Sequence, residues 1–347
     1  GMVQVGQGTY DRFRAWELAF NEVYAEAQKT QPWKQWAEDG ARQMVESGTT
    51  AAADIVTDLD AAGALASQGM HGIAYWEGMG WHNAEWMEKG RTELIRQLRR
   101  MNEEQLPNLG ISPHAPYTLE SEPFVDLPDI ARQLNMRLHI HLAETPLEAG
   151  TYPPVLTTYS AADWSDHDWE SYRQLKEVGK GASAIQFVDQ LGSLGPDVHI
   201  AHGVWANGED RRILRQRGVG VALCPRSNRI TNTGKDAPVR EYLEEGNLVS
   251  VGTDSLSSTP TLDLLDDDGT GCNFFRQQLF QHTGGLRRDD GADAVAVNDA
   301  DGNLLLGGKI RLFPVHVPDS LQLLLQQLLK RLTGMCNFLH YCPPSFV

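Results

Sequence analysis

The sequence predicts an α/β fold, a (β/α)8 TIM-like barrel whose wall is incomplete. Short apolar runs alternate with longer stretches of helical periodicity, which is the pattern of successive βα units. Several runs end in a histidine or an aspartate, and in such barrels the carboxyl ends of the strands carry the chemistry. With 347 residues, the chain is long enough for one barrel and an additional segment.

The strands are predicted after a helical start. Apolar residues recur at helical spacing over residues 9–47, with a break at Pro32, so no strand is expected before residue 50. Strands are then predicted near residues 52, 74, 110, 139, 199, 221 and 250. A closed barrel of this type has eight strands, so we expect the missing one to be the first.

Helices are predicted between the strands. The helical stretches are 58–68, 84–105 and 121–135, the last interrupted near Pro128. Residues 150–182 form a long insertion, which is a candidate specificity loop.

We expect residues 1–268 to form the barrel domain and residues 269–347 to form a divergent C-terminal segment. Within that segment, residues 292–297 and 304–317 are candidate strands. An amphipathic helix is predicted at 319–333, where Asp319 can cap a leucine-rich apolar face.

The charge and the cysteines limit the partners and the compartment. The formal net charge of −16 disfavours nucleic acid and anionic membrane surfaces, and favours a neutral or cationic small-molecule substrate. The four cysteines form no CxxC pair, and no apolar stretch is long enough to span a membrane. We expect a reduced, cytoplasmic protein. The two free edges of an incomplete barrel would also allow a homo-oligomer.

The chemistry is predicted around the strand that ends in His141. His139 and His141 share a face of this strand because strand side chains alternate, and Glu144 follows just beyond it. His202 ends the next predicted strand, and Asp254 ends the last. The carboxyl ends of parallel strands meet at one mouth. His141, His202 and Asp254 are therefore candidate ligands of a divalent ion such as zinc, with Glu144 as a proton shuttle.

Each candidate also has a structural interpretation. A histidine at a strand end can be a hydrogen-bonded structural residue, and His139 competes with His141 for the ligand role. Asp254 could cap a following helix. His114, on a proline-flanked loop, could be a turn residue or a substrate contact. Cys224 could be a nucleophile, although packing is the usual use of such a residue.

At these residues the chain resembles the amidohydrolase superfamily, in particular its cytosine-deaminase and chlorohydrolase-like branch. The resemblance extends over about residues 9–266. The segments that carry it are Ser112–Tyr117, His139–Thr145, Ile200–Gly203, Leu223–Asn228 and Gly252–Ser255.

The resemblance implies a metal-dependent barrel enzyme that hydrolyses non-peptide C–N or C–halogen bonds, often by deaminating a nitrogen heterocycle. It implies one divalent metal ion, with zinc preferred and iron as the alternative. By position, His141 resembles a metal ligand and Glu144 the proton shuttle. His202 resembles the histidine that ligates the metal or orients the attacking water. Asp254 resembles the aspartate that binds metal and takes a proton from that water, and His114 a substrate-facing histidine.

The sequence departs from this family pattern in two places. The family's first strand supplies a His-x-His pair, whereas the first histidine here is His71. The flanking β-sandwich of the family is also missing at this end, and residues after about 268 do not follow the family. We therefore expect weak metal affinity and low or no activity for this chain. The alternative functions are an impaired fragment, a non-catalytic scaffold of the same ancestry, or a metal-free barrel in which the histidines only pack.

Overall fold

The fold is described from a computed structural model. It describes residues 2–30, 32–103, 108–150 and 181–264, and four short strands between residues 287 and 311. The predicted helix at 319–333 and residues 151–180 of the predicted insertion at 150–182 lie outside these residues. Of the candidate C-terminal strands, the structure describes β9 (Ala296–Asn298) and β10 (Leu304–Leu306). Those two strands pair with each other, and β8 (Arg287–Arg288) pairs with β11 (Ile310–Arg311), both antiparallel.

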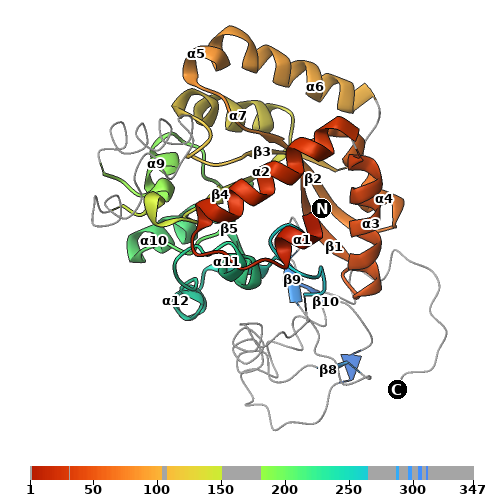
Figure 1. Cartoon of the computed structure of the whole chain (residues 1–347). Coiled ribbons are helices and arrows are strands. Elements are labelled where there is room, and N and C mark those ends of the chain that lie inside the picture. The colour runs from red at the N-terminus through yellow and green to blue at the C-terminus, as the bar shows by residue number, and fades with distance from the viewer. Residues whose placement is uncertain are drawn as a thin grey trace, which may run out of the picture.

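One sheet of seven parallel strands organises the molecule, and its strands follow one another in chain order. Figure 1 shows the strands in the centre, with helices around them. The strands are β1 (Ala51–Val56), β2 (His71–Gly78), β3 (Leu109–Pro113), β4 (Arg137–Leu142), β5 (Val198–His202), β6 (Gly220–Leu223) and β7 (Leu248–Val251). All seven predicted strands are confirmed. Within the described chain β1 and β7 stand at opposite ends of the sheet, so it is a curled, open part of a TIM-like barrel.

The register of the sheet separates an apolar face from a polar one. Ile111, Leu138, Val198, Ile200 and Val221 lie in register on one face and are fully buried in the main core. Because side chains alternate along a strand, the intervening residues face the other way. That second face carries polar rows, including Glu77 beside Ser112 and His139 beside His199. The inner face of the sheet therefore carries polar side chains that can form a functional site.

The N-terminal helices contact the chain near the carboxyl ends of the strands. Helices α2 (Phe13–Thr30) and α3 (Trp33–Glu46) confirm the helical start, and α1 (Met2–Gly6) precedes them. The Trp16 indole donates a 2.8 Å hydrogen bond to the carbonyl of Ser257, which follows β7. The Phe13 ring lies 6.4 Å from that of Tyr117, in the loop after β3. Helix α2 therefore lies beside the mouth of the sheet.

Three predicted helices differ from the observed ones. The predicted helix 58–68 is two short segments, the 3-10 helix η1 (Leu59–Ala61) and α4 (Ala64–Ser67). The predicted helix 84–105 is three successive segments, α5 (Asn83–Glu85), a π-helical stretch (Trp86–Gly90) and α6 (Arg91–Glu103). Helix α7 (Ser121–Gln133) continues through Pro128, where an interruption was predicted. Proline cannot donate to the carbonyl four residues earlier, that of Phe124. The buried Ser193 hydroxyl donates to this carbonyl at 2.6 Å, and the helix therefore tolerates the proline.

The remaining described helices are short and follow the strands. They are η1 (Leu59–Ala61), α4 (Ala64–Ser67), η3 (Pro146–Glu148), α9 (Ala184–Gln190), α10 (Gly208–Arg217), α11 (Pro225–Ile230) and α12 (Val239–Glu244).

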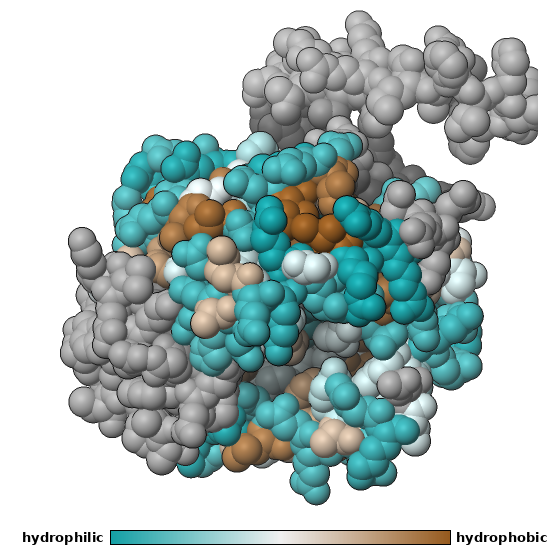
Figure 2. Space-filling model, turned by 90° about the horizontal axis from the view of Figure 1, so that it is seen from above, coloured by the Kyte–Doolittle hydropathy of each residue, from teal (hydrophilic) through white to brown (hydrophobic). Residues whose placement is uncertain are grey.

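The face of the molecule shown in Figure 2 is mostly hydrophilic, with separate hydrophobic patches. Among the described helices, none is both long and apolar enough to cross a membrane.

Candidate active site

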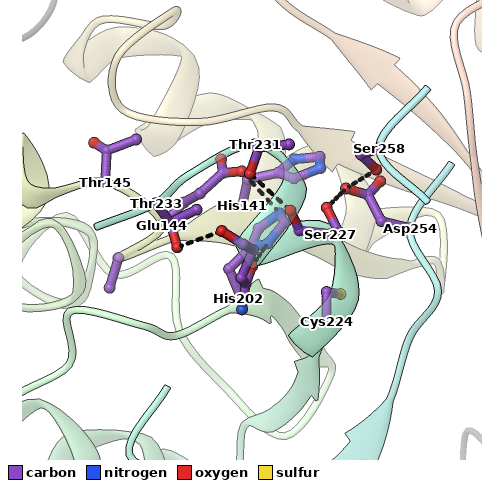
Figure 3. A network of polar contacts seen from close by, with 12 residues as sticks. His141, Glu144, Thr145, His202, Cys224, Ser227, Thr231, Thr233, Asp254 and Ser258 are labelled. Carbon is purple, nitrogen blue, oxygen red and sulfur yellow. Dashed lines mark hydrogen bonds and ion pairs between the residues drawn. The ribbon is translucent and has the colours of Figure 1, made fainter. Parts of the chain in front are cut away.

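Five predicted side chains meet at the carboxyl edge of the sheet. His114 follows β3, His141 lies on β4, Glu144 follows β4, His202 ends β5 and Asp254 follows β7. The ring centroids of His141 and His202 are 5.5 Å apart, and those of His114 and His141 are 4.7 Å apart. Figure 3 shows His141, His202 and Glu144 grouped together, with Asp254 beside them. The strand ends therefore bring the predicted residues to one mouth.

Left-handed backbone is concentrated at this mouth. Ala143, His202 and Asp254 have φ values of 54°, 73° and 60°. Residues with a side chain rarely adopt this region, and it persists where the surrounding structure holds it in place. The three positions follow or end β4, β5 and β7, where the chain turns away from the sheet and the functional side chains project.

Each of the three histidines has its Nδ1 atom occupied. Nδ1 of His141 lies 3.1 Å from the His114 carbonyl oxygen, and Nδ1 of His202 lies 2.9 Å from the Asn228 side-chain oxygen. Nδ1 of His114 lies 2.7 Å from the Thr118 hydroxyl, which itself donates to the Ala115 carbonyl. These oxygens accept, so the network assigns the proton of each ring to Nδ1. All three Nε2 atoms are left as lone-pair donors.

Glu144 lies where it can exchange protons with this group. Its Oε1 is 3.4 Å from Nε2 of His202, and its Oε2 accepts a 2.9 Å hydrogen bond from the Tyr117 hydroxyl. Burial raises the pKa of Glu144 to about 7, against the lowering effect of His141. A carboxyl group with a pKa near neutrality suits a general acid and base.

Glu148 organises the loop that carries Glu144, and the sequence analysis did not identify it. Its buried carboxylate accepts 2.9 Å hydrogen bonds from the backbone N–H groups of Ala143, Glu144 and Thr145. Thr145 and Glu148 together form a capping box at the start of η3. The Thr-x-x-Glu spacing is a known signature of this motif, so the sequence did contain the signal.

Asp254 is held by serines and does not cap a helix. It accepts hydrogen bonds from the hydroxyls of Ser227 at 2.6 Å and Ser258 at 2.9 Å, and from the N–H of Ser255 at 2.8 Å (Figure 3). No helix starts after it within the described residues up to 264. These contacts disfavour the helix-cap interpretation.

A second group of ligand atoms includes a residue that the sequence analysis did not select. One ligand atom each from Glu77, His114 and His141 lie within 4.8 Å of one another, and Glu77 Oε1 is 3.9 Å from His114 Nε2. Among the described residues, these three form the group of potential metal ligands whose ligand atoms all lie within 4.8 Å of one another. It shares only His141 with the predicted ligands His141, His202 and Asp254. Glu77 lies near the end of β2, so the strand-end rule applied to the other residues would have found it.

Burial also shifts the pKa values of other residues near the mouth. It raises the pKa of Glu77 to about 8, with a further contribution from the charge of Asp254. It raises the pKa of the Cys224 thiol well above its usual value, which disfavours a nucleophilic role. His139 lies deeper, with its ring 5.3 Å from that of Tyr75, and its Nδ1 has no hydrogen-bond partner. It does not belong to the Glu77 group.

Residues 155–300 match the model of the amidohydrolase family, and this range crosses the predicted boundary at residue 268. The chain is 30% identical over 232 residues to a 5-methylthioadenosine/S-adenosylhomocysteine deaminase of Thermococcus kodakarensis, a match that covers 66% of this chain and 49% of the relative. It is 31% identical over 231 residues to a 5'-deoxyadenosine deaminase of Methanopyrus kandleri, covering 65% and 47%. The chain thus spans about half the length of the curated relatives it matches.

Solved structures share the fold at lower identity. An atrazine chlorohydrolase from Arthrobacter aurescens, complexed with zinc, has a TM-score of 0.57 at 18% identity, with coverage of 77% of this chain and 60% of that one. The aminofutalosine deaminase of Helicobacter pylori, in complex with methylthio-coformycin, has a TM-score of 0.58 at 20% identity, with coverage of 77% and 64%.

Proposed function

We propose that the chain, whose residues 155–300 match the amidohydrolase family model, is a member of the amidohydrolase superfamily and a metal-dependent hydrolase of non-peptide C–N bonds that deaminates a nitrogen heterocycle. The observation that carries this proposal is the convergence at one mouth of three imidazoles with unprotonated Nε2 atoms and a carboxyl group of near-neutral pKa, Glu144. The relatives are named as deaminases of adenosine-type nucleosides, and such a nucleoside is the substrate class we propose first.

A divalent metal ion fits the donor set of the mouth, and zinc is our first choice. Imidazole and carboxylate are its usual protein ligands besides thiolate. We propose that His141, His202 and Asp254 bind the ion, as the sequence analysis predicts. When bound, such an ion lowers the pKa of a coordinated water toward neutrality.

The protein side chains then move the protons. His202 orients the attacking water through Nε2, and Asp254 accepts a proton from it. Glu144 delivers a proton to the leaving amine, so that water adds to the ring carbon and ammonia departs. Tyr117 fixes the Glu144 carboxyl by its hydrogen bond. His114 lies at the same mouth and contacts either the substrate or the ion.

We propose further that residues 1–268 form the barrel domain and residues 269–347 form a separate segment. The small-molecule function fits a reduced, cytoplasmic setting, and the buried Cys224 thiol is compatible with it. The open edges of the described sheet favour association of two copies.

Ammonia release tests the function. Metal-reconstituted protein would be assayed with 5'-methylthioadenosine, S-adenosylhomocysteine, 5'-deoxyadenosine, guanine, cytosine and a chloro-s-triazine. We expect turnover of at least one amino-heterocycle, and Glu144→Gln should lower kcat about 100-fold or more.

Glu93→Gln, a matched change of an exposed glutamate on α6, should leave turnover unchanged. Metal-loaded protein that releases no ammonia from any of these compounds would contradict the enzyme proposal and favour the non-catalytic scaffold. Equal turnover by Glu144→Gln and the unmodified chain would remove Glu144 from the mechanism.

A further inference from the structure

Glu77 brings a buried carboxyl group to the mouth of the sheet. It lies near the end of β2, and its side chain is 6% exposed. Its Oε1 lies 3.9 Å from Nε2 of His114, the residue that follows β3. This separation is too long for a hydrogen bond. Among the residues that the structure describes, none is hydrogen-bonded to the Glu77 carboxyl group.

The neighbour of Glu77 on β3 is in the same condition. Ser112 is the register partner of Glu77, and its side chain is fully buried. Its hydroxyl has no hydrogen-bond partner in the described part of the chain. Buried polar groups are normally hydrogen-bonded, and an unpaired one costs stability. Two such groups side by side on the inner face of the sheet therefore point to a ligand that binds there.

The position of Glu77 indicates that this ligand is the substrate. The ring of the neighbouring His114 lies 4.7 Å from that of His141 and 5.5 Å from that of Tyr117, whose hydroxyl binds Glu144. Glu77 thus lies beside the proposed reaction centre. The metal ion and the proton transfers of the proposed mechanism use other residues. The Glu77 carboxyl group is therefore suited to bind a part of the substrate that does not react.

The chemistry of a carboxyl group limits what it can recognise. Its oxygens accept hydrogen bonds in either protonation state. Nε2 of His114 is also an acceptor, because the ring proton lies on Nδ1. The bound group must therefore supply O–H or N–H donors. In an adenosine-type nucleoside the ring nitrogens carry no hydrogen and the amino group is the one that leaves, so the sugar hydroxyls are the donors that remain.

We propose that Glu77 binds the 2'- and 3'-hydroxyls of a ribose, with His114 contacting the substrate beside it, and that Glu77 makes the chain selective for ribonucleosides. An acidic side chain is a common partner of ribose hydroxyls in nucleotide-binding proteins. This inference rests on the proposed function and adds a specificity-determining residue to it. The proposed ligands of the metal ion are unchanged.

Binding of two nucleosides that differ only in these hydroxyls tests the proposal. Adenosine and 2',3'-dideoxyadenosine would be titrated calorimetrically into the full chain with Zn²⁺ added, in a Glu144→Gln background that slows turnover. We expect adenosine to bind about 10- to 100-fold more tightly, the usual value of hydrogen bonds to a charged group. With Glu77→Leu the two nucleosides should bind equally, at the affinity that dideoxyadenosine has when Glu77 is present. Glu77→Gln keeps one acceptor oxygen and should keep part of the preference.

Glu244→Leu is the matched control. Glu244 is exposed at the end of α12, shortly before β7 begins, and so lies at the edge of the sheet opposite the mouth. This variant should retain the full preference for adenosine. Circular dichroism verifies that every variant is folded.

The outcomes separate this sugar site from the function. An equal preference for adenosine in Glu77→Leu and in the chain with Glu77 would overturn the inference and leave the proposed function intact. The inference is also wrong if the chain with Glu77 binds the two nucleosides equally, or binds neither. A preference that depends on Glu77, in a chain that releases no ammonia from any nucleoside when Glu144 is present, would support the sugar site and contradict the deaminase.

Discussion

A neutral histidine offers Nε2 to an ion or a water when its proton lies on Nδ1, and an acceptor at Nδ1 favours this tautomer. For His141 and His202 the acceptor lies outside the strand that carries the ring. Asn228 of α11 orients His202, and the loop after β3 orients His141 through the backbone of His114. The sequence analysis selected the histidines by their positions at strand ends. The tautomers of His141 and His202 follow from contacts between separate segments, which no local pattern encodes, whereas that of His114 depends on Thr118 in the same loop.

Glu148 fixes the backbone position of Glu144. Its carboxylate accepts three backbone N–H bonds in the loop after β4. Glutamine would offer one acceptor oxygen and would place an NH2 group against an N–H donor. We expect Glu148→Gln to lower the free energy of unfolding by about 1–3 kcal/mol. It should also lower kcat more than it changes KM, because Glu144 loses its position.

Chemical denaturation and steady-state kinetics test this prediction. Glu122→Gln, an exposed glutamate in the first turn of α7, is the control and should change neither quantity. If Glu148→Gln lowers stability and leaves kcat unchanged, Glu148 supports the fold and does not position Glu144.

At the scale of elements, all seven strands were predictable because apolar runs of strand length are bounded by turn residues and helices. Glu77 could equally have been predicted as a site residue, because it lies near the end of a predicted strand, like His141 and His202. The continuation of helix α7 through Pro128 could not be predicted, because it depends on Ser193, which follows α9 and lies far away in sequence. A rule based on the local sequence around a proline cannot take into account a hydrogen bond from the Ser193 hydroxyl, which belongs to another segment.

A double-mutant cycle tests this account of α7. Ser193→Ala leaves the Phe124 carbonyl buried without a donor, and should cost about 1–3 kcal/mol in the free energy of unfolding. In a Pro128→Ala background, the restored N–H of residue 128 can donate to that carbonyl, so the same serine change should cost clearly less. Equal costs of Ser193→Ala in both backgrounds, measured by urea denaturation, would show that the serine does not compensate for the proline.

Strand β1 carries a carboxyl group on the apolar, helix-facing side of the sheet. Asp54 is in register with the buried Ala74, and among the described residues no hydrogen bond or ion pair reaches its carboxylate. Burial raises the pKa of Asp54 to about 7. In the unfolded chain it titrates near 3.9, so between about pH 4 and 7 the folded state binds more protons. Its contribution to stability therefore falls as the pH rises through this window and is constant above it.

Asp54→Asn removes this pH dependence. We expect the variant and the unmodified protein to be similarly stable near pH 4.5. At pH 8 the variant should be more stable, on the order of 1–2 kcal/mol because the half-buried side chain retains some solvent. Urea denaturation at the two pH values provides the measurement. A gain of the same size at both would show that the charge of Asp54 is not responsible.

For the molecule as a whole, the net charge of −16 gives no information on where a charged partner would bind. The global charge indicated only which classes of partner to exclude or to favour. The inner face of the sheet gathers carboxylates and neutral imidazoles at one mouth, an arrangement that attracts a cation. Whether the predicted ligands or the Glu77 group meet at bonding distance depends on the curvature and register of the sheet, which the order of strands does not determine.

An ion held by His141 on β4, His202 at the end of β5 and Asp254 after β7 would couple binding to the stability of the sheet. An ion that binds the folded chain alone, at about 100 times its dissociation constant, adds roughly 2.7 kcal/mol to the free energy of unfolding. For a domain of this size, that corresponds to a rise in Tm of roughly 5–10 °C. Calorimetry with added Zn²⁺ should show this rise, and excess chelator should reverse it. His141→Asn should melt at the same temperature with and without Zn²⁺, whereas His71→Asn, a change of an exposed histidine at the start of β2, should keep the full increase. A Zn²⁺-dependent rise that persists in His141→Asn would place the ion elsewhere in the molecule.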